Sequence, residues 1–295
     1  MTAHRLPHLA QRFFNAPQMI LPEKAEIIMA ALADRFGIAQ LFSGGMAVAL
    51  ARPMAFDEDY DQPTAPRRDV GYDVTRDGVA MVPVCGTLVH RLGCVRPYSG
   101  MTGYDGVRHN VLSALADPAI RGVLLDIDSP GGEVSGLFDL ADTLFAARKI
   151  KPVWAVLNES AYSAGYAIAS ACARVTVPRT GGTGSIGAVV LHTEISKALD
   201  KDGITVTVIR SAARKMEGNR FEPLSDATRA RIQAEVDAVA DLFVDTVARN
   251  RNLAAGRIRD MEAGCFYGAA GVKAGLADAV MAPDAAYRAL VAAIN

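Results

Sequence analysis

The sequence has little cysteine and almost no net charge, and both absences exclude classes of protein. Only four cysteines occur among 295 residues, none forms a CxxC pair, and none has a histidine at metal-ligand spacing. We therefore expect reduced thiols and no metal site. The formal net charge of −1 provides no basic excess of the kind that nucleic-acid binding requires.

Long apolar runs are also missing. Each apolar stretch is interrupted by Gly, Asp or Arg well before the roughly 18 residues that a membrane span needs. The N-terminal stretch has no basic segment followed by an apolar one, so it predicts no secretory signal. We expect a cytoplasmic protein that does not enter the membrane. Hydrophobic residues make up 51% of the chain, which is enough for a large buried core.

Composition divides the chain into two regions. Residues 1–75 contain a short helical pattern at 23–36, followed at 51–75 by a stretch crowded with proline, acidic residues and arginine. This pattern predicts an N-terminal extension that consists of a short helix and a flexible linker. Residues 76–295 are expected to form the compact domain.

Within that domain, apolar β-rich runs alternate with segments of helical periodicity. The predicted strands are 79–84, 122–127, 153–157 and 204–209, and the predicted helices are 106–116, 134–148, 164–173 and 226–249. In the last helix, an apolar stripe is formed by Ile232, Val236, Val239, Phe243 and Val247. The alternation predicts an α/β fold with a mainly parallel sheet and flanking helices. In such folds chemistry gathers in the loops beyond the carboxyl ends of the strands.

The first such loop is Asp128-Ser129-Pro130-Gly131-Gly132. Proline stiffens the turn, and the two glycines allow backbone conformations that other residues avoid and a close approach by a second group. Exposed N–H groups in this turn are suited to holding an oxyanion. A plain strand-to-helix turn explains the same residues.

The second loop contains Ser160 and Ser163 and precedes a helix of small residues. A serine at a helix N-terminus lies where N–H groups and the helix dipole favour developing negative charge. The small neighbours Ala164 and Gly165 leave room for a substrate carbonyl. Either serine is also a suitable helix cap, which is the alternative function of this position.

The third loop, residues 181–187, is rich in glycine but lacks the GK[ST] ending of a phosphate-binding loop. A serine nucleophile would instead need a base. The histidines are His4, His8, His90, His109 and His192. The sequence around each histidine does not indicate that it is the base, although a Ser-His-Asp arrangement stays open. Lys215, just past the predicted strand 204–209, is the other option, because a desolvated lysine can serve as a base. An ordinary surface lysine fits that position equally well.

Taken together, four motifs occur in a familiar order: SPGG at 129–132, SAG at 163–165, TGSIG at 183–187, and a lysine loop before a long helix. This order resembles the signal peptide peptidase A family, peptidase family S49. The resemblance implies a crotonase/ClpP-like fold and a serine endopeptidase without a cofactor. It also implies roles for six residues: Ser163 as nucleophile, Lys215 as base, Ser185 as the residue that orients the lysine, and Gly131, Gly132 and Ala164 as the oxyanion hole.

Further stretches resemble a phage branch of that family. They are PYSGMTGY at 97–104, KPVWA at 151–155, and the N-terminal LPHLA and FNAPQMI. This resemblance implies protein or peptide substrates during capsid assembly, with phage scaffold, portal and capsid proteins as partners, and no nucleic acid. The family and the long helix 226–249 together suggest a homo-oligomer.

Three other functions remain open from the sequence. One is a cellular peptidase of the signal-peptide type. Another is a crotonase-type acyl-CoA enzyme, which would use carboxylates such as Glu133 or Glu159. The last is an inactive structural subunit of a procapsid. The absence of a transmembrane anchor and the PYSGMTGY stretch favour the phage head-maturation peptidase over the cellular one. The carboxylates of an acyl-CoA enzyme do not explain Ser163, Ser185 and Lys215 together.

Overall fold

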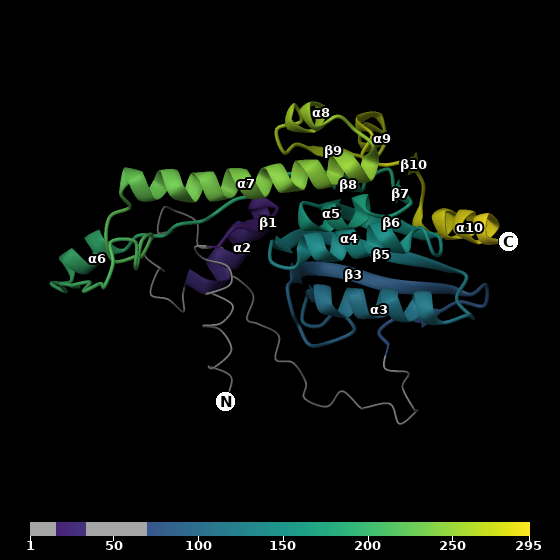
Figure 1. Cartoon of the computed structure of the whole chain (residues 1–295), viewed down its shortest axis with the longest axis horizontal. Helices are drawn as coiled ribbons and strands as arrows, with labels where there is room; N and C mark the ends of the chain where they lie inside the picture. The colour runs from purple at the N-terminus through teal and green to yellow at the C-terminus, as the bar shows by residue number, and fades with distance from the viewer. Residues whose placement is uncertain (1–15, 34–69) are drawn as a thin grey trace, which may run out of the picture.

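A ten-stranded sheet organises the part of the chain that the computed structural model describes, which is residues 16–33 and 70–295, with only the backbone of 29–33 (Figure 1). The strands are β1 Gln18–Ile20, β2 Asp73–Val74, β3 Val79–Val89, β4 Met101–Gly103, β5 Gly122–Glu133, β6 Val153–Tyr162, β7 Arg174–Val177, β8 Gly182–Gly184, β9 Cys265–Tyr267 and β10 Ala279–Val280.

The main path through the sheet runs β10-β7-β6-β5-β3-β2. The four pairings from β10 to β3 are parallel, and β2 joins the other edge antiparallel to β3. Three short strands extend the far ends of the long ones: β1 pairs antiparallel with β5, β4 pairs parallel with β3, and β8 pairs parallel with β6. β9 continues the sheet antiparallel to β8. The expected α/β fold with a mainly parallel sheet is confirmed.

Helices cover both faces of this sheet. They are α2 Pro22–Ala33, α3 Tyr104–Ala116, α4 Leu137–Ala147, α5 Ala164–Ser170, α6 Ser196–Lys201, α7 Asp226–Arg251, α8 Ala255–Arg259, α9 Ala269–Ala274 and α10 Pro283–Ile294. None of the helices in the described ranges has both the length and the apolar character that crossing a bilayer demands.

β5 shows why the buried strands appear as continuous apolar runs. Its side chains alternate between faces, so Leu125 and Ile127 join the large core under α3, α4 and α5, whereas Leu124 packs beneath α10 with Leu290. Both faces are therefore covered, and apolar residues are required at every position of the run. The predicted strands 79–84, 122–127 and 153–157 are confirmed as parts of β3, β5 and β6.

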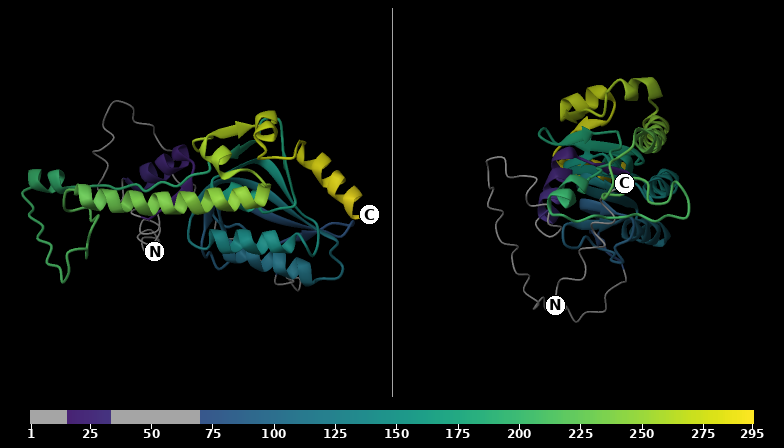
Figure 2. Two further views of the ribbon diagram at one scale, coloured as in Figure 1. Left: turned by 45° about the horizontal axis from the view of Figure 1, so that its top comes forward. Right: turned by 90° about the vertical axis from the view of Figure 1, so that its left-hand side faces the viewer.

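One predicted strand is wrong. Residues 204–209 form no strand and belong to an arm, residues 191–225, that also carries α6 (Figures 1 and 2). All six of these residues are β-branched, which suits a sheet, but Ile204, Val206 and Ile209 are exposed, with Ile209 at 93%. β-propensity reflects the fit of a side chain to neighbouring strands, and among residues 16–33 and 70–295 no strand lies next to this segment.

The long helix α7 joins this arm to the sheet. Its C-terminal half packs on the core through Phe243 and Val247, which are fully buried, and Asn250 donates a hydrogen bond to Ser170 in α5 at 3.0 Å. Its N-terminal half extends past the sheet, so Ile232 and Val236 of the predicted apolar stripe are only half-buried (Figure 1).

The N-terminal region is described only in part. α2 confirms the helix predicted at 23–36 as far as residue 33; residues 34–36, and residues 51–69 of the predicted linker, lie outside the described ranges. β1 and β2 fall within the expected extension of residues 1–75, yet both pair with strands of the central sheet.

An ion pair fixes the C-terminal segment to α7. Arg251, at 8% side-chain exposure, forms a bidentate contact with Asp278 at 2.7 and 3.1 Å, and the Val175 N–H also donates to that carboxylate. Burial acts to raise the pKa of Asp278, but the hydrogen bonds from Arg251 and Val175 outweigh it and hold the pKa below its ordinary value.

We expect Asp278→Asn to lower the free energy of unfolding by about 2 kcal/mol at pH 7, because it leaves the Arg251 guanidinium without its carboxylate. A depressed carboxyl pKa contributes stability above the ordinary aspartate value of about 3.9, and this stability is lost as the pH falls through the folded-state pKa. Urea unfolding of both proteins between pH 7 and pH 3 measures the difference. A difference that does not shrink at low pH would contradict this role.

Candidate active site

Ser163 lies in the sharp turn between β6 and α5. Its backbone adopts φ 52° and ψ −120°, a conformation that a residue with a Cβ rarely takes. The residue is 1% exposed, and its side chain does not cap α5. The helix-cap alternative is therefore wrong for this serine, and a strained strand-to-helix turn of this kind is typical of a nucleophile.

The glycine turn lies beside Ser163. After a register shift past Ile127, β5 pairs with β6 through Ser129 and Ala161, which aligns the two loops. The Ser129 hydroxyl donates to the Gly86 carbonyl at 2.7 Å and accepts the Gly131 N–H at 3.2 Å. The turn is thus held by its own serine, and a Cβ added to Gly131 would lie 3.0 Å from the Ser163 Cβ.

Both glycines of this turn are required by the space around them. Gly131 has φ 106°, and a Cβ on Gly132 would lie 1.9 Å from the Leu88 carbonyl oxygen. Across the turn, the Ala164 N–H is the first of α5 and has no acceptor in its own helix. The structure therefore places the predicted oxyanion residues Gly131, Gly132 and Ala164 around Ser163.

Ser185 also belongs to this cluster. The Ser163 N–H donates to the Gly184 carbonyl at 2.9 Å, so the third loop is bonded directly to the second. Ser185 has φ 54°, is buried, and donates its own N–H to the Gly264 carbonyl at 2.9 Å. The structure thus brings Ser163 and Ser185 together, as the motif order predicts.

Lys215 is not part of the cluster within one chain. It is exposed and lies on the arm, which reaches past the sheet beside the N-terminal half of α7 (Figures 1 and 2). Glu217, two residues further on, forms an ion pair with Arg231 of α7. From Arg231 to Phe243, where α7 meets the core, the helix rises about 18 Å. The chain therefore holds Lys215 well away from its own Ser163.

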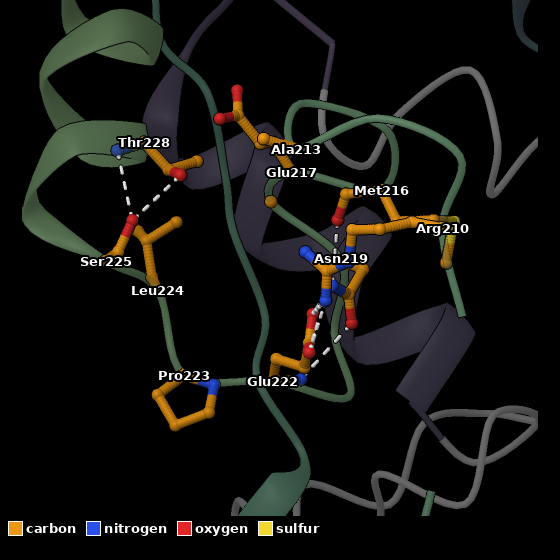
Figure 3. A pocket seen from close by; sticks show the side chains of 11 residues that line it. Arg210, Ala213, Met216, Glu217, Asn219, Glu222, Pro223, Leu224, Ser225 and Thr228 are labelled. Atoms are coloured by element: carbon orange, nitrogen blue, oxygen red, sulfur yellow. Dashed lines mark hydrogen bonds and ion pairs between the residues drawn. The ribbon is translucent and has the colours of Figure 1, made fainter. Parts of the chain in front are cut away.

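The loop around Lys215 is nevertheless ordered by polar contacts. The Asn219 amide donates to the Met216 carbonyl and to Glu222, while Arg210 forms an ion pair with Glu222, and these residues line a cavity of about 400 Å³ (Figure 3). Hydrogen bonds from Asn219 and Arg210 lower the pKa of the Glu222 carboxyl. The arm therefore presents its lysine from a defined loop.

A second cavity, of about 410 Å³, opens next to Ser185. Its walls come from β1, α2, the segment 187–191 and residues 263–265, and two carboxylates, Glu23 and Glu26, contribute to the lining. Cys265 also lines it, and burial together with the nearby Glu23 charge raises the pKa of that thiol. The cavity is mainly apolar, with acidic residues among those that surround Ser185.

The carboxylates of the acyl-CoA alternative have other partners. Glu133 accepts the His90 N–H at 2.7 Å, and Glu159 accepts the Thr180 hydroxyl at 2.8 Å. Ser160, the second candidate serine, accepts the Gly182 N–H at 3.0 Å. These contacts give all three residues structural roles in the loops that hold Ser163.

β1 is the feature of the site that the sequence analysis missed. Gln18–Ile20 runs antiparallel to the glycine turn, with Met19 opposite Gly132. Three residues are too few for a periodic pattern, and the available signal was the short apolar run Met19–Leu21 that ends at Pro22.

A strained serine at a helix N-terminus, facing glycine N–H groups across a tight turn, has the geometry of acyl-transfer sites with a serine nucleophile. Comparison with known proteins agrees with this class. The model of peptidase family S49 matches residues 146–294, about half of the chain, and this range includes Ser163, Ser185 and Lys215. The chain belongs to peptidase family S49.

Two phage proteins are similar over nearly the whole chain. Head-tail preconnector protein GP5 of Enterobacteria phage P21 is 39% identical over 290 residues, which is 98% of this chain and 58% of that protein. Capsid assembly protease C of Escherichia phage lambda is 40% identical over 285 residues, which is 94% of this chain and 64% of that protein. The chain thus spans about 60% of the length of these two relatives.

Solved structures show a more distant likeness. A ClpP1 variant from Listeria monocytogenes is 12% identical with a TM-score of 0.43, covering 68% of this chain and 90% of that one. An enoyl-CoA hydratase/isomerase family member is 15% identical with a TM-score of 0.43, covering 76% and 75%.

The backbone of Ser163 leads to a stability prediction. We expect Ser163→Gly to be about 1 kcal/mol more stable than Ser163→Ala, because glycine relieves the strain at φ 52° whereas alanine keeps the Cβ that causes it. Chemical denaturation of the two variants measures this difference. Equal stabilities, or a more stable alanine variant, would contradict a strained turn.

Proposed function

We propose that this protein is a serine endopeptidase in which Ser163 is the nucleophile and Lys215 its base. The observation that carries the proposal is the buried, strained Ser163 turn, with a hydroxyl that caps nothing and lies beside the Gly131–Gly132 turn. Membership of peptidase family S49 supports the same chemistry.

The chemistry follows from the positions of the groups. A neutral Lys215 amine takes the Ser163 proton as Oγ attacks a peptide carbonyl, and the resulting oxyanion accepts hydrogen bonds from the Gly132 and Ala164 N–H groups. Lys215 then returns the proton to the leaving amine, and water cleaves the acyl-enzyme by the same route in reverse. Ser185 accepts a hydrogen bond from the lysine and orients it. Each oxyanion donor is worth roughly 3–4 kcal/mol in the transition state.

Because Lys215 lies on the projecting arm, we propose that a second copy supplies it. Three features support an arm that binds another copy: the exposed β-branched residues Ile204 and Val206, the half-buried stripe of α7, and an α6 that has no buried residue. The cavity at Ser185, which includes Glu23 and Glu26 in its lining, suits a basic side chain that enters from outside. The protein would therefore act as a homo-oligomer.

The biological setting comes from the relatives. One relative is named for capsid assembly and the other for the head-tail preconnector of a phage. We propose the same setting here, with protein substrates among the scaffold, portal and capsid components of an assembling head.

Mixing two inactive variants tests the sharing of the site. We expect Ser163→Ala and Lys215→Ala each to lower casein cleavage by at least about 1,000-fold, since each removes a group needed for nucleophilic attack. An equimolar mixture should recover a substantial fraction of wild-type activity, because some sites then combine an intact Ser163 with an intact Lys215 from a neighbour.

Lys197→Ala is the matched control, since Lys197 is a lysine of the same arm, on α6. On its own, Lys197→Ala should keep wild-type activity. Mixing it with Ser163→Ala should not increase that activity, because Lys197→Ala has lost no catalytic group. If the two inactive variants stay inactive together while each remains folded and oligomeric, Lys215 does not act across copies. Full activity in either single variant would overturn its catalytic role.

A further inference from the structure

The chain's own residues 18–21 lie along the glycine turn of the candidate active site. β1 runs antiparallel to the end of β5, with Gln18 opposite Glu133, Met19 opposite Gly132 and Ile20 opposite Gly131. The Leu21 N–H continues this pairing and donates to the Pro130 carbonyl at 2.9 Å. This short segment therefore covers the whole glycine turn.

The segment is also held along its opposite edge. Gln18 and Val189 exchange both backbone hydrogen bonds, at 2.8 and 2.9 Å, as an isolated antiparallel bridge. Val189 follows the TGSIG loop that carries Ser185. An extended segment bonded to β5 on one side and to Val189 on the other, beside a nucleophile, is arranged as peptides are when they bind by strand addition.

Met19 lies at the centre of this arrangement. The Cβ position built on Gly131 is 2.1 Å from the Met19 carbonyl oxygen and 3.0 Å from the Ser163 Cβ. The Met19 carbonyl oxygen and the Ser163 Cβ are therefore no further apart than the sum of these two distances. The Met19 side chain is fully buried and belongs to the large core cluster. A carbonyl thus faces the turn that we assign to the oxyanion hole, and an apolar side chain fills the space behind it.

We propose that Gln18–Leu21 is an internal ligand that occupies the peptide-binding groove and competes with substrates. In this groove Met19 takes the position of the residue whose carbonyl Ser163 would attack. A substrate must displace β1 before it binds, and the side chain that replaces Met19 must be uncharged and of similar size. The inference rests on the proposed peptidase function, because it assigns the groove of the same nucleophile.

A binding experiment that needs no catalysis tests this inference. The probe is a fluorescent, end-blocked nonapeptide copying residues 16–24, APQMILPEK, and its affinity is measured by anisotropy against full-length chains that all carry Ser163→Ala. We expect Met19→Glu to release β1, because a carboxylate is costly in a fully buried site. The peptide should then bind at least about tenfold more tightly than to the Met19→Leu control, since the fraction of open grooves rises.

A second pair of variants guards against a folding defect from the buried charge. Leu21→Pro removes the N–H that bonds to Pro130, whereas Leu21→Ala keeps it. The proline variant should also bind the peptide more tightly than its alanine partner. A peptide with glutamate in place of its methionine should bind none of these chains.

The outcomes separate the two proposals. Equal peptide affinity across each pair, or no binding to any chain, overturns the internal ligand. Binding as expected, combined with no casein cleavage by the chain with an intact Ser163, leaves the groove assignment standing and overturns the proposed peptidase function instead.

Discussion

The candidate site depends on the parallel pairing of β5 with β6 and its continuation into β8. Up to Ile127 and Leu157 this pairing is regular; beyond it the register shifts, and Ser129 meets Ala161. The Ser163 N–H then bonds to Gly184. Three loops that are separated in sequence are therefore fixed to one another by backbone contacts. This backbone pairing sets the position of each side chain of the site.

Backbone pairing also explains how far the sequence analysis reached. The strands within β3, β5 and β6 were predictable because both faces of the sheet are covered, which imposes continuous apolar runs at 79–84, 122–127 and 153–157. The turns that follow these strands were predictable as the place of an active site, because the carboxyl ends of parallel strands meet at the same edge of the sheet. The pattern therefore predicted where Ser163 and the two glycines lie, whereas their roles, and the role of Ser185, came from the family resemblance that the order of the motifs carries.

Two features were out of reach, for opposite reasons. The run 204–209 has strong β-propensity but no neighbouring strand in the described part of the chain, and propensity alone does not produce a strand. β1 has only three residues and no pattern of its own, yet the glycine turn and Val189 provide partners on both sides. In both cases the presence or absence of a neighbouring backbone segment decides whether a strand forms, and the local sequence pattern does not contain this information. The same limit applies to Lys215, whose distance from Ser163 is set by the direction of α7.

The continuous helix α7, at 26 residues, also limits which insertions and deletions the protein can tolerate. Its C-terminal half is locked to the core by Phe243 and Val247, while its other end carries the arm. Each residue inserted or deleted between these ends would turn the arm by about 100° and shift it by about 1.5 Å. Insertions that preserve the direction of the arm are therefore limited to lengths close to whole helical turns, so this segment should tolerate substitution far better than changes in length.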